Sequence, residues 1–255
     1  MEELCERPYV VCHMVSSLDG RIDGEYFRRK EMVPILEASN NIRERLDCDA
    51  VLYGAVTMAE SYAEGYVGQL PKSSERYPRT DYIASSEVES FYVSIDIEGR
   101  IRWSGKYIEK RGRKKSHVIE VLTENVSDDY ISYLRTFDIS YIFAGEEKLD
   151  CRLLLEKLKD KFHIQRVMLS GGGVVNWTFL QAGVIDELSL VLCPLTDGSR
   201  VTAALFDRSS YLPQGTPIAF TLENIQTLPG NGIWLVYKPV NVSVERGGTN
   251  YESED

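Results

Sequence analysis

The sequence predicts an α/β fold in which helices cover both faces of a mostly parallel central sheet, with an antiparallel hairpin at the C-terminal end. Short apolar runs alternate with stretches of helical periodicity, which is the pattern of strand–helix–strand units. The runs are apolar at almost every position, as in parallel strands that are buried on both faces. A hairpin turn, Pro229-Gly230-Asn231-Gly232, precedes the last apolar run and predicts the antiparallel edge.

The first elements are justified by local composition. Residues 9–15 (YVVCHMV) predict a strand because they are apolar, rich in β-branched side chains and bounded by Pro8. Residues 16–20 predict a turn. A helix is predicted over roughly residues 31–46, because apolar side chains recur at helical spacing: Met32, Ile35, Leu36, Ile42 and Leu46. Residues 50–53 predict the next strand, which ends at Gly54, and residues 64–90 predict a long loop rich in Gly, Pro, Ser and Tyr.

The remaining elements follow the same alternation. Ser127 is the predicted N-cap of a helix whose apolar face is Tyr130, Ile131 and Leu134. Asp150 is the predicted N-cap of another helix, whose inward face is Leu153, Leu154 and Leu158. Short apolar runs predict strands at residues 91–95, 117–122, 139–144, 167–169, 188–193 and 233–237.

Length and charge limit the possible functions. The chain has 255 residues, with 29 Lys and Arg against 39 Asp and Glu, and its formal charge is −10. A hydrophobic content of 43% is ordinary for a globular protein, so a disordered or fibrous chain is excluded. The negative charge repels phosphate backbones, so no nucleic-acid partner is expected. No repeat or linker divides the chain, and we expect one domain over residues 1–241 and a polar, frayed tail over residues 242–255.

Cysteines and histidines predict neither a disulfide framework nor a metal site. The five cysteines are scattered and form no C-x-x-C pair, which favours a reducing, cytoplasmic location. The three histidines have no metal-ligand spacing. The N-terminus has no apolar signal sequence, and the uncharged run of residues 167–185 holds three adjacent glycines that lipid would not satisfy. We therefore expect no membrane partner.

The strongest functional signal is the segment of residues 167–180 (VMLSGGGVVNWTFL). A buried strand runs into three glycines and then into the start of a helix. Glycines let a ligand approach the backbone closely, and a helix N-terminus offers unpaired N–H groups to a phosphate. This pattern favours a pyrophosphate-bearing cofactor; the alternative is a tight strand–helix connection without a ligand.

Two further strand ends carry the same kind of signal. Ser16-Ser17-Leu18-Asp19-Gly20-Arg21-Ile22 follows the first strand, at the sheet edge where α/β proteins bind ligands. Asp19 either holds this turn or faces the substrate, and the residue chemistry alone favours the turn. Tyr53-Gly54-Ala55-Val56-Thr57 again places a glycine and a hydroxyl between a strand and a helix, although one glycine is weak support.

Together these segments carry a resemblance to a known family. The segments at residues 53–57 and 167–176 resemble the two cofactor loops of the dihydrofolate reductase fold. With residues 17–22 added, the chain resembles the reductase domain of riboflavin biosynthesis, which is the C-terminal domain of the bifunctional deaminase–reductase family. The resemblance runs roughly from residue 8 to residue 237 and implies a three-layer α/β/α fold. The deaminase motifs H-x-E and P-C-x-x-C are absent from the chain.

The resemblance implies an activity and a set of site residues. It implies a homodimer that uses NADPH to reduce 5-amino-6-(5-phosphoribosylamino)uracil, by hydride transfer to C1 of the opened ribosyl chain. Ser17, Leu18 and Asp19 would border the nicotinamide and the substrate, and Asp19 is the candidate catalytic acid. The cofactor would be bound by Gly54 and Thr57 on one side and on the other by Ser170, Gly171, Gly172, Gly173, Val174, Val175 and Asn176.

Departures from the family pattern fall on the substrate side. His13 stands where the family has Lys, and Ser170 stands where it has Glu. These replacements change charge and hydrogen-bonding capacity, so another pyrimidine, a pterin or a small carbonyl or imine is an alternative substrate. A nucleotide-binding protein without catalysis is a further alternative. His13 is either a satisfied core histidine or a contact to the substrate.

Two surface features allow a structural and a functional interpretation. The basic run Lys110-Arg111-Gly112-Arg113-Lys114-Lys115 is either a solvated turn or a site for the 2′-phosphate of NADPH. The Tyr-rich loop, residues 62–82, is either a lid over the substrate or an amphipathic cover for the core.

Overall fold

The computed structural model describes residues 7–84, 87–208 and 215–240, and these residues form one sheet of ten strands. The strands lie side by side in the order β4-β5-β3-β2-β7-β1-β8-β10-β9, and β6 pairs with β5 next to β4. Their bounds are β1 Tyr9–Ser16, β2 Ala50–Gly54, β3 Phe91–Ile95, β4 Tyr107–Ile108, β5 Ser116–Leu122, β6 Ser140–Phe143, β7 Arg166–Leu169, β8 Glu187–Leu192, β9 Phe220–Leu228 and β10 Gly232–Pro239.

The sheet is parallel except at its two ends. Strands β1, β2, β3, β5, β6, β7 and β8 pair in parallel. Strand β10 is antiparallel to both β8 and β9, and the turn Pro229–Asn231 connects β9 to β10. The predicted parallel sheet with a C-terminal antiparallel hairpin is therefore confirmed. The two-residue antiparallel strand β4 was not predicted, because it is too short to give a periodic pattern.

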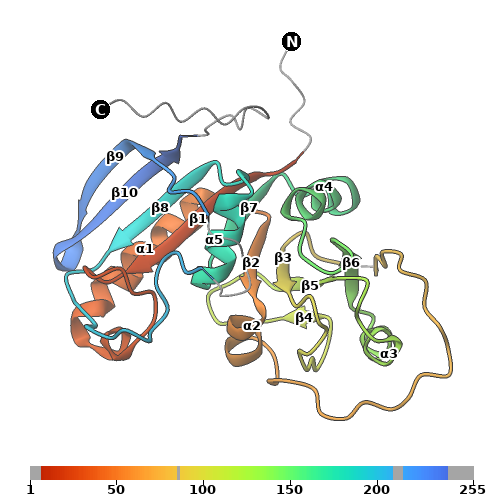
Figure 1. Cartoon of the computed structure of the whole chain (residues 1–255). Helices are drawn as coiled ribbons and strands as arrows, with labels where there is room; N and C mark the ends of the chain where they lie inside the picture. Colours follow the sequence, from red (N-terminus) through yellow and green to blue (C-terminus); the bar gives the residue numbers. More distant parts are fainter. Residues whose placement is uncertain (1–6, 85–86, 209–214, 241–255) are drawn as a thin grey trace, which may run out of the picture.

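Helices cover both faces of this sheet, as the three-layer prediction requires (Figure 1). Helices α4 and α5 pack their apolar side chains against one face, over β1, β2, β3, β5 and β7. On the opposite face, α2 and α3 cover β3, β5 and β6, and α1 covers β1, β8 and β10. The helices are α1 Val33–Leu46, α2 Ala55–Ser61, α3 Asp128–Thr136, α4 Cys151–Phe162 and α5 Gly173–Gln181.

Both predicted helix caps are present. The Ser127 hydroxyl accepts a hydrogen bond from the Tyr130 N–H at 3.2 Å, and the Asp150 carboxylate accepts from two N–H groups of the first turn of α4. The inward face of α4 differs in one residue from the prediction. Leu155 is fully buried and Leu153 only half-buried, because spacings of three and four residues from Cys151 select the other side chains.

The start of α1 also differs from the prediction. The α-helix begins at Val33, two residues later than expected, after a short 3₁₀ turn over Lys30–Met32. Pro34 occupies the first turn of α1, where its missing N–H leaves no acceptor unpaired. The sequence thus predicted which elements form more accurately than the residues at which they begin and end.

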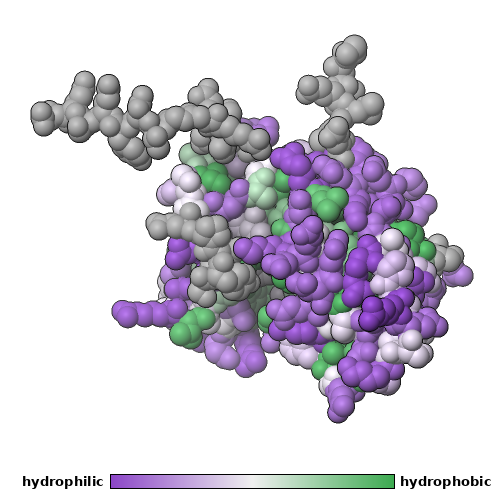
Figure 2. All heavy atoms as spheres, turned by 45° about the vertical axis from the view of Figure 1, so that its right-hand side comes forward, coloured by the Kyte–Doolittle hydropathy of each residue, from purple (hydrophilic) through white to green (hydrophobic). Residues whose placement is uncertain are grey.

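Apolar side chains gather in three buried clusters, and the surface is correspondingly polar. Figure 2 shows one face, on which hydrophilic side chains predominate and hydrophobic ones form small scattered groups. Within the described residues, no helix is both long and apolar enough to span a bilayer. The predicted tail, residues 242–255, lies outside the described residues.

Candidate active site

The carboxyl ends of β1, β2 and β7 lie together at one edge of the sheet. Strands β1 and β2 come early in the sequence, and β7, which comes much later, lies between them and pairs in parallel with both. The three loops that follow these strands, residues 17–22, 54–57 and 170–175, therefore meet at a switch in strand order (Figure 1). Such a switch point is where open α/β sheets form their ligand-binding crevices.

The three glycines after β7 have three different structural requirements. Gly171 has φ +95°, a backbone conformation that other residues rarely adopt. At Gly173, a Cβ would lie 2.2 Å from the Ala204 carbonyl oxygen, so only glycine lets these two segments approach. At Gly172, a Cβ would meet no protein atom within 4 Å, so its backbone borders open space. The loop therefore exposes backbone at its middle glycine.

Helix α5 begins in this loop, so its N-terminus lies at the same edge of the sheet as the loops after β1 and β2. The first N–H groups of an α-helix have no acceptor within the helix, and no side chain caps this end of α5. Its first turn contains no acidic side chain. The helix dipole adds partial positive charge at the same place, which favours an anion, and a carboxylate oxygen of Asp207 already lies near Gly173.

The loop after β2 is joined directly to the glycine loop. The Gly54 N–H donates to the Gly171 carbonyl oxygen at 3.0 Å. A Cβ at Gly54 would lie 2.8 Å from Cγ2 of Val175, so the absence of a side chain lets α5 pack this closely. Thr57 lies in the first turn of α2, three residues after Gly54, and is half-buried. The structure thus brings Gly54 of one predicted cofactor loop next to Gly171 and Val175 of the other.

Two buried side-chain oxygens in this region have no hydrogen-bond partner within the described part of the chain. They are Oγ of Ser170 and Oδ1 of Asn176. The amide nitrogen of Asn176 does have a partner, since it donates to the Leu205 carbonyl oxygen at 2.9 Å. Buried polar atoms are nearly always hydrogen-bonded, so two unpaired oxygens beside the glycine loop set this region apart from an ordinary core.

Asp19 is bound within the loop that follows β1. Its carboxylate accepts hydrogen bonds from the Ser17 hydroxyl at 2.6 Å, the Gly198 N–H at 2.7 Å and the Asp197 N–H at 3.0 Å. The Ser17 hydroxyl, followed by the two N–H groups, holds the pKa of Asp19 well below its usual range. This favours the turn-holding interpretation and weighs against a proton donor, a role that stays an untested prediction. Leu18, 57% exposed, is the apolar side chain of this loop that a ligand can reach.

His13 is buried between the sheet and α1. One ring nitrogen lies 3.0 Å from the Ser189 hydroxyl and the other lies 3.1 Å from the Ser39 hydroxyl. Burial lowers the pKa of His13 to about 4, so the ring is neutral near pH 7. Both nitrogens are satisfied within the core, which favours the structural interpretation. The predicted contact to the substrate remains untested.

Sequence reasoning missed residues 195–207, which pack across the loop after β1. The Leu18 N–H donates to the Leu195 carbonyl oxygen at 2.7 Å, and the Leu205 N–H donates to the Gly20 carbonyl oxygen at 3.0 Å. The Asp207 N–H donates to the Gly173 carbonyl oxygen at 3.0 Å, so one segment joins two site loops. Its only sequence signal was the polar stretch after Cys193-Pro194, which has no periodicity.

The two surface features with an open role meet at Tyr62, whose hydroxyl donates to the hydroxyl of Tyr53 at the end of β2, and Lys110 lies over the Tyr62 ring. The loop containing residues 72–79 is held against α3, where Lys72 pairs with Asp129 and Arg79 pairs with Asp128. This contact favours the cover over the lid. The basic run of residues 110–115 connects β4 to β5, and its Arg113 interacts with Tyr92 and with Tyr53, the residue before Gly54, so its predicted role toward a 2′-phosphate stays untested. Within the described residues, no group of three or more His, Cys, Asp or Glu side chains could hold a metal ion.

Comparison with protein families gives one match over most of the chain. The model of the RibD C-terminal domain matches residues 8–233. A curated relative from Methanothermobacter thermautotrophicus, a 2,5-diamino-6-ribosylamino-4(3H)-pyrimidinone 5′-phosphate reductase, is 24% identical over 227 residues. That alignment covers 87% of this chain and 94% of the relative. A reductase of the same name from Archaeoglobus fulgidus is 26% identical, with 81% and 89% covered.

Solved structures show the same fold. The RibD protein of Acinetobacter baumannii superposes with a TM-score of 0.61 at 21% identity over 92% of this chain, which spans 59% of that protein. The riboflavin biosynthesis reductase Rib7 of Saccharomyces cerevisiae superposes with a TM-score of 0.60 at 18% identity, with 94% of this chain and 93% of that chain covered. At these identities the superpositions establish the fold.

Proposed function

The chain belongs to the RibD C-terminal domain family of riboflavin-biosynthesis reductases, and from that premise we propose that it reduces a ribosylaminopyrimidine 5′-phosphate with NADPH. The observation that carries the proposal is the junction of the two glycine loops, where the Gly54 N–H donates to the Gly171 carbonyl oxygen beside the N-terminus of α5. A dinucleotide diphosphate is the anion that suits this arrangement.

Each part of the crevice has a distinct role in this proposal. The N–H groups at the start of α5 and the open backbone at Gly172 bind the diphosphate. Asn176 holds the segment after Pro194 against α5, because its amide nitrogen donates to the Leu205 carbonyl oxygen. Leu18 excludes water beside the reacting carbon, and Asp19 fixes the loop by its bonds to residues 197 and 198. When bound, NADPH supplies the hydride, so the protein contributes positioning.

The named relatives bear on the identity of the substrate. They are named for a 2,5-diamino-pyrimidinone, which differs at ring carbon 2 from the uracil that the sequence resemblance implied. We therefore place the diamino compound first and the uracil second. Reduction in both cases occurs on the ribosyl chain, away from ring carbon 2, so the difference concerns recognition.

Cofactor binding and turnover separate the alternatives. Trp177 lies on α5, one residue beyond Asn176, and its fluorescence is expected to change when NADPH is added. NADPH absorbance is then followed with each of the two pyrimidines as substrate. Consumption with the diamino compound supports the proposal, whereas binding without consumption supports the non-catalytic alternative. If neither the Trp177 fluorescence nor the thermal stability responds to NADPH, the reductase proposal and the non-catalytic alternative are both wrong.

The predicted homodimer has a candidate surface. Strand β9 is the last strand of the sheet, and its side chains Leu222 and Ile225 are 48% and 60% exposed. Exposed apolar side chains on an edge strand are suited to pairing with a second copy. Ile225→Lys should convert a dimer to a monomer in size-exclusion chromatography with light scattering. Val201→Lys is the control, since Val201 is 94% exposed in a loop.

A further inference from the structure

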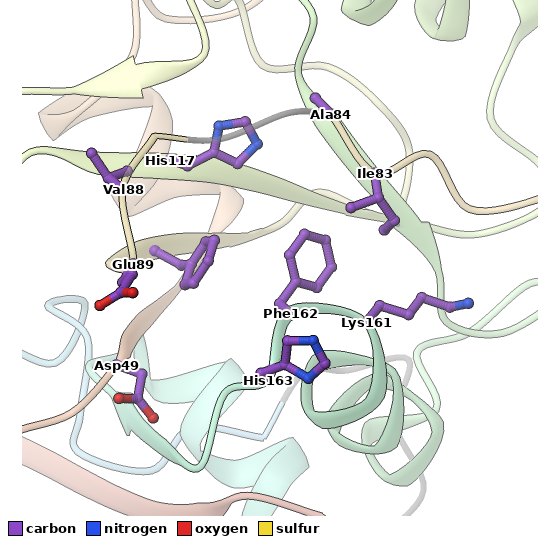
Figure 3. A pocket seen from close by; sticks show the side chains of 10 residues that line it. Asp49, Ile83, Ala84, Val88, Glu89, His117, Lys161, Phe162 and His163 are labelled. Carbon is purple, nitrogen blue, oxygen red and sulfur yellow. The ribbon is translucent and has the colours of Figure 1, made fainter.

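A cavity of about 440 Å³ opens at the opposite edge of the sheet from the glycine loops. It lies at the amino ends of β2, β3 and β5, beside the end of α4, so it is separate from the proposed reductase site (Figure 3). Its volume is in the range of sites for small organic molecules. The residues that line it are Asp49, Ile83, Ala84, Val88, Glu89, Phe91, His117, Lys161, Phe162 and His163.

Aromatic rings form one wall of this cavity. The ring centroids of Phe91 and Phe162 lie 5.6 Å apart at an angle of 69°, and His117 lies edge-on to Phe91 at 6.4 Å. Phe91 begins β3 and Phe162 ends α4, so the sheet and the helix hold the two rings in place. Aromatic faces attract cations as well as apolar groups.

Negative charge gathers on the other side. Figure 3 shows the carboxylates of Asp49 and Glu89 on the same side of the cavity. One oxygen of Asp49 accepts from the Gln165 N–H at 2.7 Å and the Arg166 N–H at 2.9 Å, which fixes the orientation of this carboxylate. Helix α4 ends at Phe162, so the negative end of its dipole also lies at the cavity.

Two basic residues of the lining, Lys161 and His117, do not offset this charge. Lys161 points away from the cavity in Figure 3, and its Nζ lies 3.5 Å from a carboxylate oxygen of Asp81. The ring of His117 is fixed by a contact of 2.7 Å to the Ser140 hydroxyl, which also accepts from the Ala84 N–H. Burial lowers the pKa of His117 to about 4, so this ring is neutral near pH 7.

We propose that this cavity binds a small organic cation, with its ammonium group toward Asp49 and Glu89 and its apolar or aromatic body against Phe91 and Phe162. An anion would be repelled by the two carboxylates and the helix end. A bare metal ion would find too few ligands, because the described residues form no group of three metal-binding side chains here.

The probe for this proposal is 2-phenylethylammonium, compared with the neutral 2-phenylethanol and the anionic phenylacetate. Binding is measured by the shifts of backbone amide signals in ¹H–¹⁵N spectra of the full chain. The expected Kd for the cation is on the order of 1 mM, as is typical of a ligand with so few atoms. The neutral analogue should bind at least about tenfold more weakly, because it lacks the charge that the carboxylates attract.

Variants identify the charges that matter. Glu89→Gln removes one carboxylate at an exposed position and should weaken binding of the cation severalfold. Asp49→Asn, which keeps an oxygen for the two N–H donors, should weaken it further. Glu87→Gln is the control, because Glu87 is exposed two residues away and does not line the cavity. The proposal is wrong if phenylacetate binds as tightly as the cation, if Glu89→Gln has no effect, or if no amide signal of the lining shifts.

The test is independent of the reductase proposal. NADPH binding, measured by Trp177 fluorescence, should be the same with and without the cation, because the two sites lie at opposite edges of the sheet. A failure of cation binding would leave the cofactor result unchanged.

Discussion

Placing a negative charge at the N-terminus of α5 should raise the stability of the protein and lower its affinity for NADPH. Val174 is the second residue of α5, is 36% exposed, and lies in a first turn without acidic side chains. Val174→Asp adds a carboxylate there, and Val174→Asn adds a neutral amide of nearly the same shape. The difference between the two variants therefore isolates the charge.

The two expected effects have opposite signs. A carboxylate near a helix N-terminus stabilises it by about 0.3–1 kcal/mol, so the Asp variant should melt roughly 1–3 °C above the Asn variant. A diphosphate at the helix end would lie about one turn away, roughly 6 Å. One pair of like charges at that distance costs about 0.7 kcal/mol in water and about 3 kcal/mol at a dielectric constant of 20. NADPH should therefore bind about 3- to 100-fold more weakly to the Asp variant.

The assay is a titration of both variants with NADPH, followed by Trp177 fluorescence at low and at high salt. The difference in NADPH affinity between the Asp and Asn variants should shrink as the salt concentration rises, because exposed charges are screened. Equal affinities of the two variants at low salt would refute the assignment of the diphosphate to this helix end. A melting temperature that is unchanged by the charge would refute the argument from the helix dipole.

Three further predictions concern stability. Burial lowers the pKa of His13 and His117 to about 4. Below pH 6.5 the unfolded chain therefore binds protons that the folded chain does not. The free energy of unfolding should fall as pH drops from about 6.5 toward 4. Urea titrations at pH 7 and pH 5 measure this loss, and His13→Gln should reduce it. Burial and then the Asp96 charge raise the pKa of Glu120, so the free energy of unfolding should instead fall as pH rises above about 4.5 through this group, and Glu120→Gln should become more stable relative to the wild type as pH rises. A difference in the free energy of unfolding between the two proteins that does not change with pH would contradict the argument. Asp150→Ala removes the cap of α4 and should cost about 0.5–2 kcal/mol in urea titration, whereas Asp150→Asn should retain most of that stability.

The elements and the glycine loops could be predicted from sequence because their causes are local. Ser127 and Asp150 cap helices by bonding N–H groups two or three residues ahead, so a short window contains both partners. Gly171 to Gly173 follow an apolar strand and precede an apolar helix, which is enough to identify a strand–turn–helix junction. The choice between Leu153 and Leu155 on α4 was not determined in this way, since only the burial of Cys151 against the sheet shows which face of the helix points inward.

The roles of individual site residues depend on partners far along the chain. Asp19 holds its loop through N–H groups 178 and 179 residues later, and His13 is satisfied by Ser189, 176 residues later. The cavity beside Phe91 likewise exists only because the end of α4 packs next to the amino ends of three strands. Sequence by itself determined the alternation of strands and helices, the two caps and the glycine turns, because a few neighbouring residues contain the whole hydrogen-bond or steric reason. Only the tertiary structure decided which side chains face a crevice and which are already satisfied, because those contacts form between segments that become neighbours when the sheet assembles.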